Sequence, residues 1–243
     1  MKASLFITCV ADAMYTNVGK SAVKVLRKLG VELDFPKRQT CCGQPGYNSG
    51  YHEETKRSAK HMIEVFQDSE HVIFLSGSCA AMVRETYIDL LKDEPEWQQR
   101  AIDLANRTYE FSEFIVKVLK VTDLGAELKA TATYHHSCHM TRSLKVVDEP
   151  VQLLANVKGL EFIELPFKGD CCGFGGTFSI KMPDISMAMV QEKTEHVDET
   201  AAEILVGSDM ACILNIQGRM SRNGQKVRTM HVAEVLAEGC GLI

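Results

Sequence analysis

The chain has 243 residues, of which 45% are hydrophobic and 24% charged, and its formal net charge is -5. This balance is ordinary for a globular protein with a hydrophobic core, and the length suits one large or two small domains. A mildly acidic chain without a run of Lys or Arg does not favour nucleic acid or an anionic membrane surface as a partner, and no apolar run approaches the roughly 18–20 residues of a membrane span.

The first half predicts alternating strands and helices. In chain order these are a strand over 4–8, a helix over about 18–29 with Gly30 as its C-cap, a strand over 31–35, a helix over about 53–66 and a strand over 71–75. Cysteines follow each of the three strands, at Cys9, at the pair Cys41-Cys42 and at Cys79.

The second half predicts a similar series. It comprises a strand over 133–137, a strand over 160–165, a helix over about 185–205 and a strand over 210–216. Two further segments, 109–115 and 230–236, share the pattern of a helix start in which a glutamate is followed by apolar residues. The second series therefore resembles the first.

Strands that alternate with helices indicate parallel βαβ units and an α/β fold. We expect two duplicated halves, 1–123 and 124–243, each a small parallel sheet flanked by helices. The join near 121–129 has no Pro- or Ser-rich stretch, so the halves are expected to pack together.

The cysteines show the duplication most directly. Eight of the nine form two ordered sets with offsets of 129, 130, 130 and 133 residues; the sets are Cys9, Cys41, Cys42, Cys79 and Cys138, Cys171, Cys172, Cys212. Both adjacent pairs continue into glycine, at Gly43 and Gly173. Cys240 has no counterpart and is interpreted as a bystander.

The N-terminus superficially resembles a signal peptide, with Lys2, a short apolar stretch and a small-x-small site at residues 11–13. Because Cys9 has a counterpart in Cys138, the segment is better interpreted as a buried strand. We expect a cytoplasmic protein, in which thiols stay reduced and clustered cysteines indicate metal or redox chemistry.

Each set of four cysteines is expected to converge, because binding sites in parallel sheets form beyond the carboxyl ends of the strands. Four thiolates suit an iron–sulfur cluster or tetrahedral Zn²⁺. Adjacent cysteines cannot readily chelate one Zn²⁺, which favours a cluster. A zinc-binding scaffold and a metal-free thiol–disulfide protein remain alternatives.

Three further features lie near the second set. His139 is a candidate additional metal ligand or proton shuttle, although a simple hydrogen-bonded histidine explains it equally well. The glycines between Gly173 and Gly176 can bring N–H groups close to a cluster, or only provide a loop with positive φ. Arg142 is more typical of a solvated surface residue than of an anion site. We expect the second set to be nearer the chemistry.

The twofold C-x31–32-C-C-G-x35–38-C arrangement resembles the cysteine-rich CCG-domain family. That family includes the cysteine-rich component of heterodisulfide reductase and the glycolate oxidase iron–sulfur subunit. The motifs are most similar to the lactate utilisation protein A branch, and they are Cys41-Cys42-Gly43-Gln44-Pro45, Ser76-Gly77-Ser78-Cys79, Tyr134-His135-His136-Ser137-Cys138-His139 and Cys171-Cys172-Gly173-Phe174-Gly175-Gly176.

The resemblance implies a role in oxidising L-lactate to pyruvate, as one component of an L-lactate:acceptor oxidoreductase. It implies electron transfer through clusters held by the two cysteine sets. It also implies two companion lactate-utilisation proteins, one of them a ferredoxin-like iron–sulfur protein.

One departure bears on the cluster type. Heterodisulfide reductase-type sites carry a fifth cysteine in a C-x-x-C pair, which supports a non-cubane cluster. Here the flanking positions hold Ser76 and Met82 in the first half, and Asp209 and Asn215 in the second. We therefore expect a conventional [4Fe–4S] cluster, with [2Fe–2S] or zinc as alternatives, and expect it to be lost readily in air.

Overall fold

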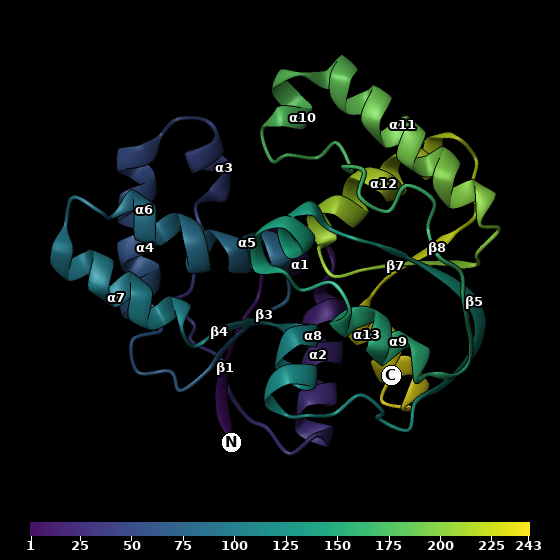
Figure 1. Ribbon diagram of the computed structural model, residues 1–243, viewed down its shortest axis with the longest axis horizontal. Helices are drawn as coiled ribbons and strands as arrows, with labels where there is room; N and C mark the ends of the chain where they lie inside the picture. The colour runs from purple at the N-terminus through teal and green to yellow at the C-terminus, as the bar shows by residue number, and fades with distance from the viewer.

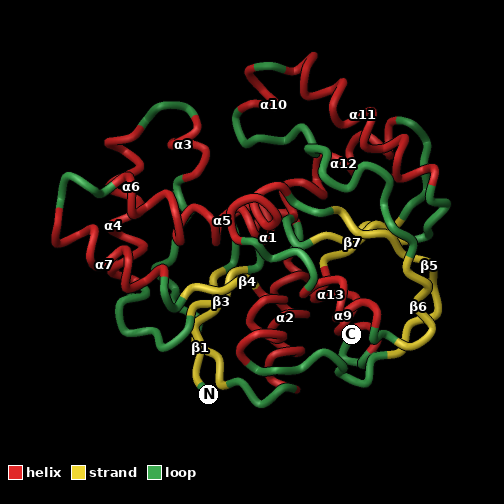
Figure 2. Tube along the Cα trace, viewed as in Figure 1, coloured by secondary structure: helices red, strands yellow, loops and turns green.

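The computed structural model describes residues 1–243 and contains two four-stranded parallel sheets flanked by helices (Figures 1 and 2). Their strand orders are β2-β1-β3-β4 and β6-β5-β7-β8, so the second sheet repeats the topology of the first. The predicted α/β class and the duplicated halves are confirmed. The boundary between residues 123 and 124 stays a prediction.

The first half supplies β1 to β4 and their helices. Its elements are β1 (Lys2–Phe6), α1 (Cys9–Met14), α2 (Thr16–Lys28), β2 (Glu32–Asp34), α3 (Gln44–Asn48), α4 (His52–Val65), β3 (Val72–Phe74), α5 (Gly77–Ala81), the π-helical turn η1 (Met82–Thr86), α6 (Tyr87–Leu90), α7 (Pro95–Ala105), β4 (Thr108–Glu110), α8 (Phe111–Glu113) and the π-helical turn η2 (Phe114–Val118).

The second half supplies β5 to β8. Its elements are β5 (Glu127–His135), the π-helical turn η3 (His139–Leu144), α9 (Glu149–Ala155), β6 (Lys158–Phe162), α10 (Phe178–Lys181), α11 (Pro183–Glu199), β7 (Ile204–Gly207), α12 (Met210–Arg222), β8 (Arg228–His231) and α13 (Val232–Gly239).

Two predicted elements of the second half are wrong. The apolar segment 210–216 is the start of α12 and not a strand, and the strand is β7, which the predicted helix over 185–205 had partly covered. The side chain of Asp209 caps α12 by accepting a hydrogen bond from the Ala211 N–H. A run of apolar residues does not by itself separate a buried strand from a buried helix, and here the cap decides.

The fourth strand of each sheet was not predicted. β4 and β8 directly precede the helix starts that the sequence pattern indicated, and both of those helices begin with a capping box. Glu113 and Glu234 are the N3 residues of the two boxes, so the repeated glutamate has the same structural role twice. Each strand is too short to leave a clear alternating pattern.

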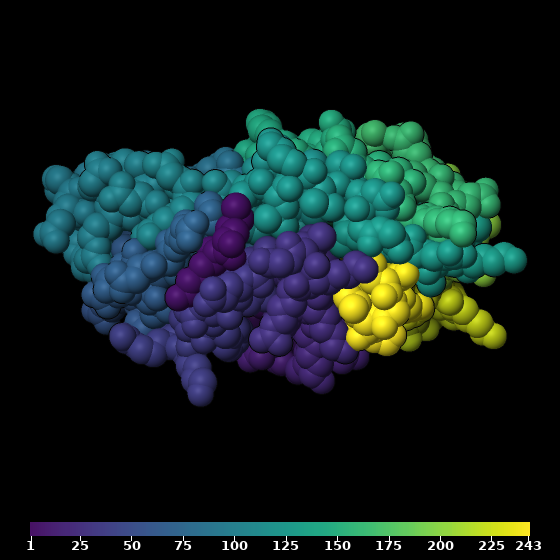
Figure 3. Space-filling view, turned by 90° about the horizontal axis from the view of Figure 1, so that it is seen from below, coloured from purple at the N-terminus to yellow at the C-terminus, as the bar shows by residue number.

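The halves share one hydrophobic core. Its buried residues come from both sheets and from α2, α8, α12 and α13, and α2 packs against α13. In Figure 3 the C-terminal residues lie directly against the α2 region. A second, smaller core under β3 belongs mainly to the first half. None of the helices is both long and apolar enough to cross a bilayer.

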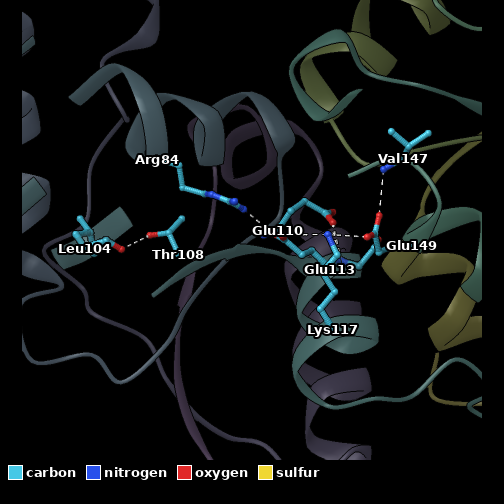
Figure 4. A network of polar contacts seen from close by, with 9 residues as sticks. Arg84, Leu104, Thr108, Glu110, Glu113, Lys117, Val147 and Glu149 are labelled. Atoms are coloured by element: carbon cyan, nitrogen blue, oxygen red, sulfur yellow. Dashed lines mark hydrogen bonds and ion pairs between the residues drawn. The ribbon is translucent and has the colours of Figure 1, made fainter. Parts of the chain in front are cut away.

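A polar network also joins the halves (Figure 4). Glu113 pairs with Arg84 at 2.8 Å and with Lys117 at 3.5 Å, and Lys117 reaches Glu149 of the second half at 2.7 Å. Both carboxylates are largely buried, and Lys117 is the cation paired with Glu149, so removing Lys117 would leave a costly unpaired charge.

Glu110 lies beside this network and is fully buried. One carboxyl oxygen accepts hydrogen bonds from the N–H groups of Ser112 and Glu113, and the other has no partner. Burial raises the pKa of Glu110 to about 8. At a pH between the unfolded and the folded pKa, this carboxyl is therefore protonated in the folded protein and ionised in the unfolded chain.

This arrangement predicts a pH dependence of folding. A raised folded pKa stabilises the fold at low pH, and the stabilisation is lost as the pH rises from about 4.5 to about 8. Glu110→Gln keeps an oxygen acceptor without a charge, so the variant should lack this loss of about 1.4 kcal/mol per pH unit. Urea unfolding between pH 5 and pH 9 measures it, with the exposed Glu85→Gln as control. Parallel curves for Glu110→Gln and the parent protein would contradict the assignment.

Candidate metal centre between the two halves

The two sheets deliver their cysteines in the same way. Cys9 begins α1 just after β1, and Cys138 immediately precedes η3 just after β5. Cys79 and Cys212 lie in the first turns of α5 and α12, which follow β3 and β7. The expected position beyond the strand ends is therefore observed, although the cysteines lie on helix starts and not within strands.

All eight paired cysteines line one cavity of about 760 Å³, measured with its open mouth. The sequence indicated two separate sets, whereas the fold places both sets around a common space. No Lys or Arg side chain lines this cavity. Any charge on the thiolates must therefore be balanced mainly by what binds there.

Each set has a deep and a shallow part. Cys42, Cys79, Cys172 and Cys212 are buried, while Cys41, Cys138 and Cys171 are half-buried and Cys9 is exposed. In the first set the Sγ atoms of Cys42 and Cys79 are 3.3 Å apart, and those of Cys9 and Cys41 are 3.8 Å apart. The thiols are close enough to act on one bound group.

The close thiols influence each other's ionisation. Hydrogen bonds from Cys42 and Cys9 lower the pKa of Cys41, whereas the bond to Cys41 raises the pKa of Cys9. In the second set, Cys138 and Cys172 likewise lower the pKa of Cys171. One thiolate per set forms readily, and its charge opposes ionisation of the others. A bound cation removes this opposition, so the donor set fits a thiophilic metal or an iron–sulfur cluster.

The glycine after each pair has a definite role. Gly43 and Gly173 adopt φ values of +84° and +76°, and a Cβ on Gly173 would lie 2.7 Å from the Ser186 carbonyl oxygen. The Gly173 N–H also donates to the Cys171 Sγ at 3.4 Å. The Cys-Cys-Gly sequence thus turns the chain back and directs an N–H group at a ligand sulfur.

The backbone of each pair is anchored differently. The Tyr87 hydroxyl donates to the Cys42 carbonyl at 2.7 Å, and the Asn215 amide donates to the Cys172 carbonyl at 2.8 Å. Neither role was predicted from the sequence, although Asn215 occupies one of the positions where a fifth cysteine was sought.

Two other positions considered for a fifth cysteine meet each other across the interface. Ser76 donates its hydroxyl to the Asp209 carboxylate at 2.9 Å, and the Ser78 N–H donates to the same oxygen at 3.0 Å. Asp209 is almost completely buried. Ser76 and Asp209 cap α5 and α12, the helices that carry Cys79 and Cys212, so this contact fixes the two sets relative to each other.

His139 also bridges the halves. Its Nδ1 lies 3.6 Å from the Cys138 Sγ, and its Nε2 lies 3.4 Å from the side-chain nitrogen of Gln44 in the first half. The glycine loop of the second half also lies close to the first half, because Gly176 approaches Pro45. These features belong to the shared cavity, and a ligand role for His139 stays a prediction.

The remaining candidates lie outside the cavity lining. Arg142 is exposed and donates to the Gly169 carbonyl at 3.1 Å, which supports the loop before Cys171. Cys240 is half-buried with its Sγ 3.7 Å from the Leu124 carbonyl oxygen. His136 is buried with its ring edge against Tyr134.

One residue with no predicted role lies beneath the second set. His135 is fully buried, and its ring nitrogen lies within 4.8 Å of the sulfurs of Cys172 and Cys212. Burial lowers its pKa to about 3, so the ring is neutral. The duplication contained a signal for this difference, because the equivalent residue three positions before Cys9 is Phe6.

The Ser76–Asp209 contact leads to a stability prediction. Asp209→Ala leaves the Ser76 hydroxyl and the N–H groups of Ser78 and Ala211 without their acceptor, so we expect a loss of about 2–4 kcal/mol in the free energy of unfolding. Asp184→Ala, at an exposed position in the first turn of α11, should change it by about 0.5 kcal/mol or less. Chemical denaturation measures both, and equal small losses would contradict the structural role of Asp209.

Comparisons with known proteins agree with this geometry. A model of the CCG cysteine-rich domain matches residues 3–84 and 132–217. Lactate utilization protein A of Oceanobacillus iheyensis is 58% identical over 97% of this chain and 96% of its own, and that of Bacillus subtilis is 57% identical over 97% and 99%.

Among solved structures, a hypothetical protein from Helicobacter pylori shares the fold with a TM-score of 0.64 at 10% identity. The match covers 99% of this chain and 49% of that longer one. The sequence matches span both cysteine sets and nearly the whole chain. The chain therefore belongs to the CCG cysteine-rich domain family, within the group of lactate utilization A proteins.

Proposed function

We propose that this protein is an iron–sulfur redox subunit of a cytoplasmic system that oxidises L-lactate to pyruvate. The observation that carries the proposal is the convergence of all eight paired cysteines on one cavity. The relatives are named lactate utilization protein A, which supports a role for this chain in lactate utilization.

Each set of four cysteines would hold one cluster, which we propose to be [4Fe–4S]. The deep cysteines are held by capped helices and anchored loops, and the shallow cysteines lie nearer the opening. A bound cluster supplies uptake and release of one electron. The chain's own residues position the sulfurs, restrict water on the deep side and keep the two sets beside each other.

Zinc is the second candidate. A tetrahedral Zn²⁺ with Zn–S bonds of about 2.3 Å has sulfur–sulfur edges of about 3.8 Å. In the first set the Cys9–Cys41 separation of 3.8 Å matches this value, and the Cys42–Cys79 separation of 3.3 Å is shorter. In that case the protein would be a scaffold subunit of the same assembly.

Metal analysis distinguishes these possibilities. After anaerobic reconstitution we expect iron and acid-labile sulfide with a visible and EPR signature of reduced clusters. Cys42→Ser and Cys172→Ser should each remove about half of the iron, because each disables one set, and Cys240→Ser should remove none. Stoichiometric zinc without labile sulfide would favour the scaffold, and reversible thiol oxidation without any metal would favour a thiol–disulfide protein.

The protein is proposed to work with two companion proteins, one of them ferredoxin-like, as a component and not as a complete enzyme. An apolar rim segment, defined by Ile180, Met182, Ile185 and Met187, supports this proposal. All four side chains are exposed, and the segment follows the loop that lines the cavity at Phe174–Gly176. Grouped exposed apolar side chains are typical of interaction surfaces.

The rim segment can be tested directly. A double change of Ile180 and Ile185 to Asp should weaken co-purification with the ferredoxin-like companion at least tenfold while leaving the iron content unchanged. Ile243→Asp, at an apolar position that is as exposed as Ile185, serves as the control. Unchanged association in the double variant would remove the rim segment from the interface.

A further inference from the structure

The two halves repeat each other closely in the helix that packs beneath the deep cysteines, which is α4 in the first half and α11 in the second. Helix α11 also buries His196, whose counterpart Val65 is only half-buried. The other five buried positions of α11 have the same spacing as five buried positions in α4 and the residue after it, and each lies 131 residues after its counterpart. They are Thr55, Ala59, Met62, Ile63, Phe66 and Ser186, Val190, Lys193, Thr194, Val197. This match identifies equivalent residues without relying on similar chemistry.

The first set rests on an apolar layer. Phe6 stacks on Phe74 with ring centroids 4.4 Å apart and meets Phe66 edge-on at 6.2 Å. Met62 is buried in the same core, as are Cys42 and Cys79. The three aromatic rings and the methionine carry no polar group that could donate a hydrogen bond to a sulfur.

The second set rests on a different layer built at the same positions. The strand pair Phe6–Phe74 becomes His135–Gly207 in the same register, Phe66 becomes Val197 and Met62 becomes Lys193. The second half therefore has two polar side chains, His135 and Lys193, where the first half has apolar ones. Both are completely buried or nearly so.

His135 lacks partners within the chain. Both of its ring nitrogens are buried without a hydrogen bond, and a ring nitrogen lies within 4.8 Å of the Cys172 and Cys212 sulfurs. An unpaired buried polar group is costly. If the four cysteines hold the four irons of the proposed cluster, the imidazole would be left to donate an N–H to a sulfur.

Lys193 places a buried cation near the same site. Its Nζ donates to the Phe167 carbonyl at 3.1 Å, in the loop that leads to Cys171. Burial lowers the pKa of Lys193, and the nearby cysteines and Asp170 act in the opposite direction. A bound anionic cluster would favour the charged ammonium group in the same way.

We propose that His135 and Lys193 are positioning residues that make the second cluster the one of higher reduction potential. Hydrogen bonds to cluster sulfurs and nearby positive charge both stabilise the reduced, more negative state. If both sets hold clusters, an electron on the first would pass to the second, so that the first is oxidised and the second is reduced by the same single electron. This inference rests on the proposed iron–sulfur function.

The test is an EPR-monitored redox titration of the reconstituted full-length protein. Cys42→Ser and Cys172→Ser assign each signal to its set. His135→Phe and Lys193→Met, which install the residues of the first half, should each lower the midpoint potential of the second signal and leave the first unchanged. Lys181→Met removes an exposed cation on the same half. Water and salt screen that charge, so the variant should change the second midpoint potential less than Lys193→Met does.

His135→Leu provides a smaller apolar replacement if the phenylalanine does not fit, and far-UV circular dichroism verifies folding. Equal potentials in the parent protein, or a second potential unchanged in folded, cluster-loaded variants, would overturn the inference. A directly coordinated nitrogen in pulsed EPR would overturn the donor role of His135. Absence of iron and sulfide from the parent protein would instead refute the proposed function.

Discussion

Parallel strands bring all their carboxyl ends to one edge of a sheet, and the rest of this structure depends on that constraint. Each sheet releases its cysteines at this edge, on the first turns of helices or in the adjacent Cys-Cys-Gly loop. Because the two edges border one cavity, eight thiols that are far apart in the sequence become neighbours. Repulsion among their thiolates then makes a cationic or cluster ligand the natural occupant.

The relative position of the edges is fixed by polar contacts as well as by the shared core. The Ser76–Asp209 hydrogen bond joins the caps of the two cysteine-bearing helices at the cavity itself. The pairing of Arg84, Glu113, Lys117 and Glu149 joins the halves at a second place. Both contacts use buried carboxylates, whose partners cannot be lost cheaply. Such contacts favour a single arrangement over a hinge between independent halves.

The duplication also shows how one scaffold can surround two sets of cysteines with unlike residues. The cysteines, the glycine turns and the capping boxes are retained in both halves. The layer beneath the deep cysteines is not retained, since Phe6 and Met62 are replaced by His135 and Lys193. Changes beneath a site can alter its electrostatic surroundings without moving its ligands.

Cysteine spacing and hydrophobic periodicity along the chain were enough to predict the duplication, the α/β class and the two sets of four cysteines. The sequence placed the helix at 53–66 and the strand at 71–75 nearly where α4 and β3 occur. It could not separate strand from helix at 210–216, where an apolar run is compatible with both and the Asp209 cap decides.

The folded chain was needed to show that both cysteine sets share one cavity, that Ser76 contacts Asp209 and that His135 lies beneath Cys172. Each of these facts depends on how the two sheets are oriented relative to each other or on which neighbours fill the space beneath a strand. Such relations between residues distant in the chain are set by packing, and a single sequence does not encode them as a local pattern.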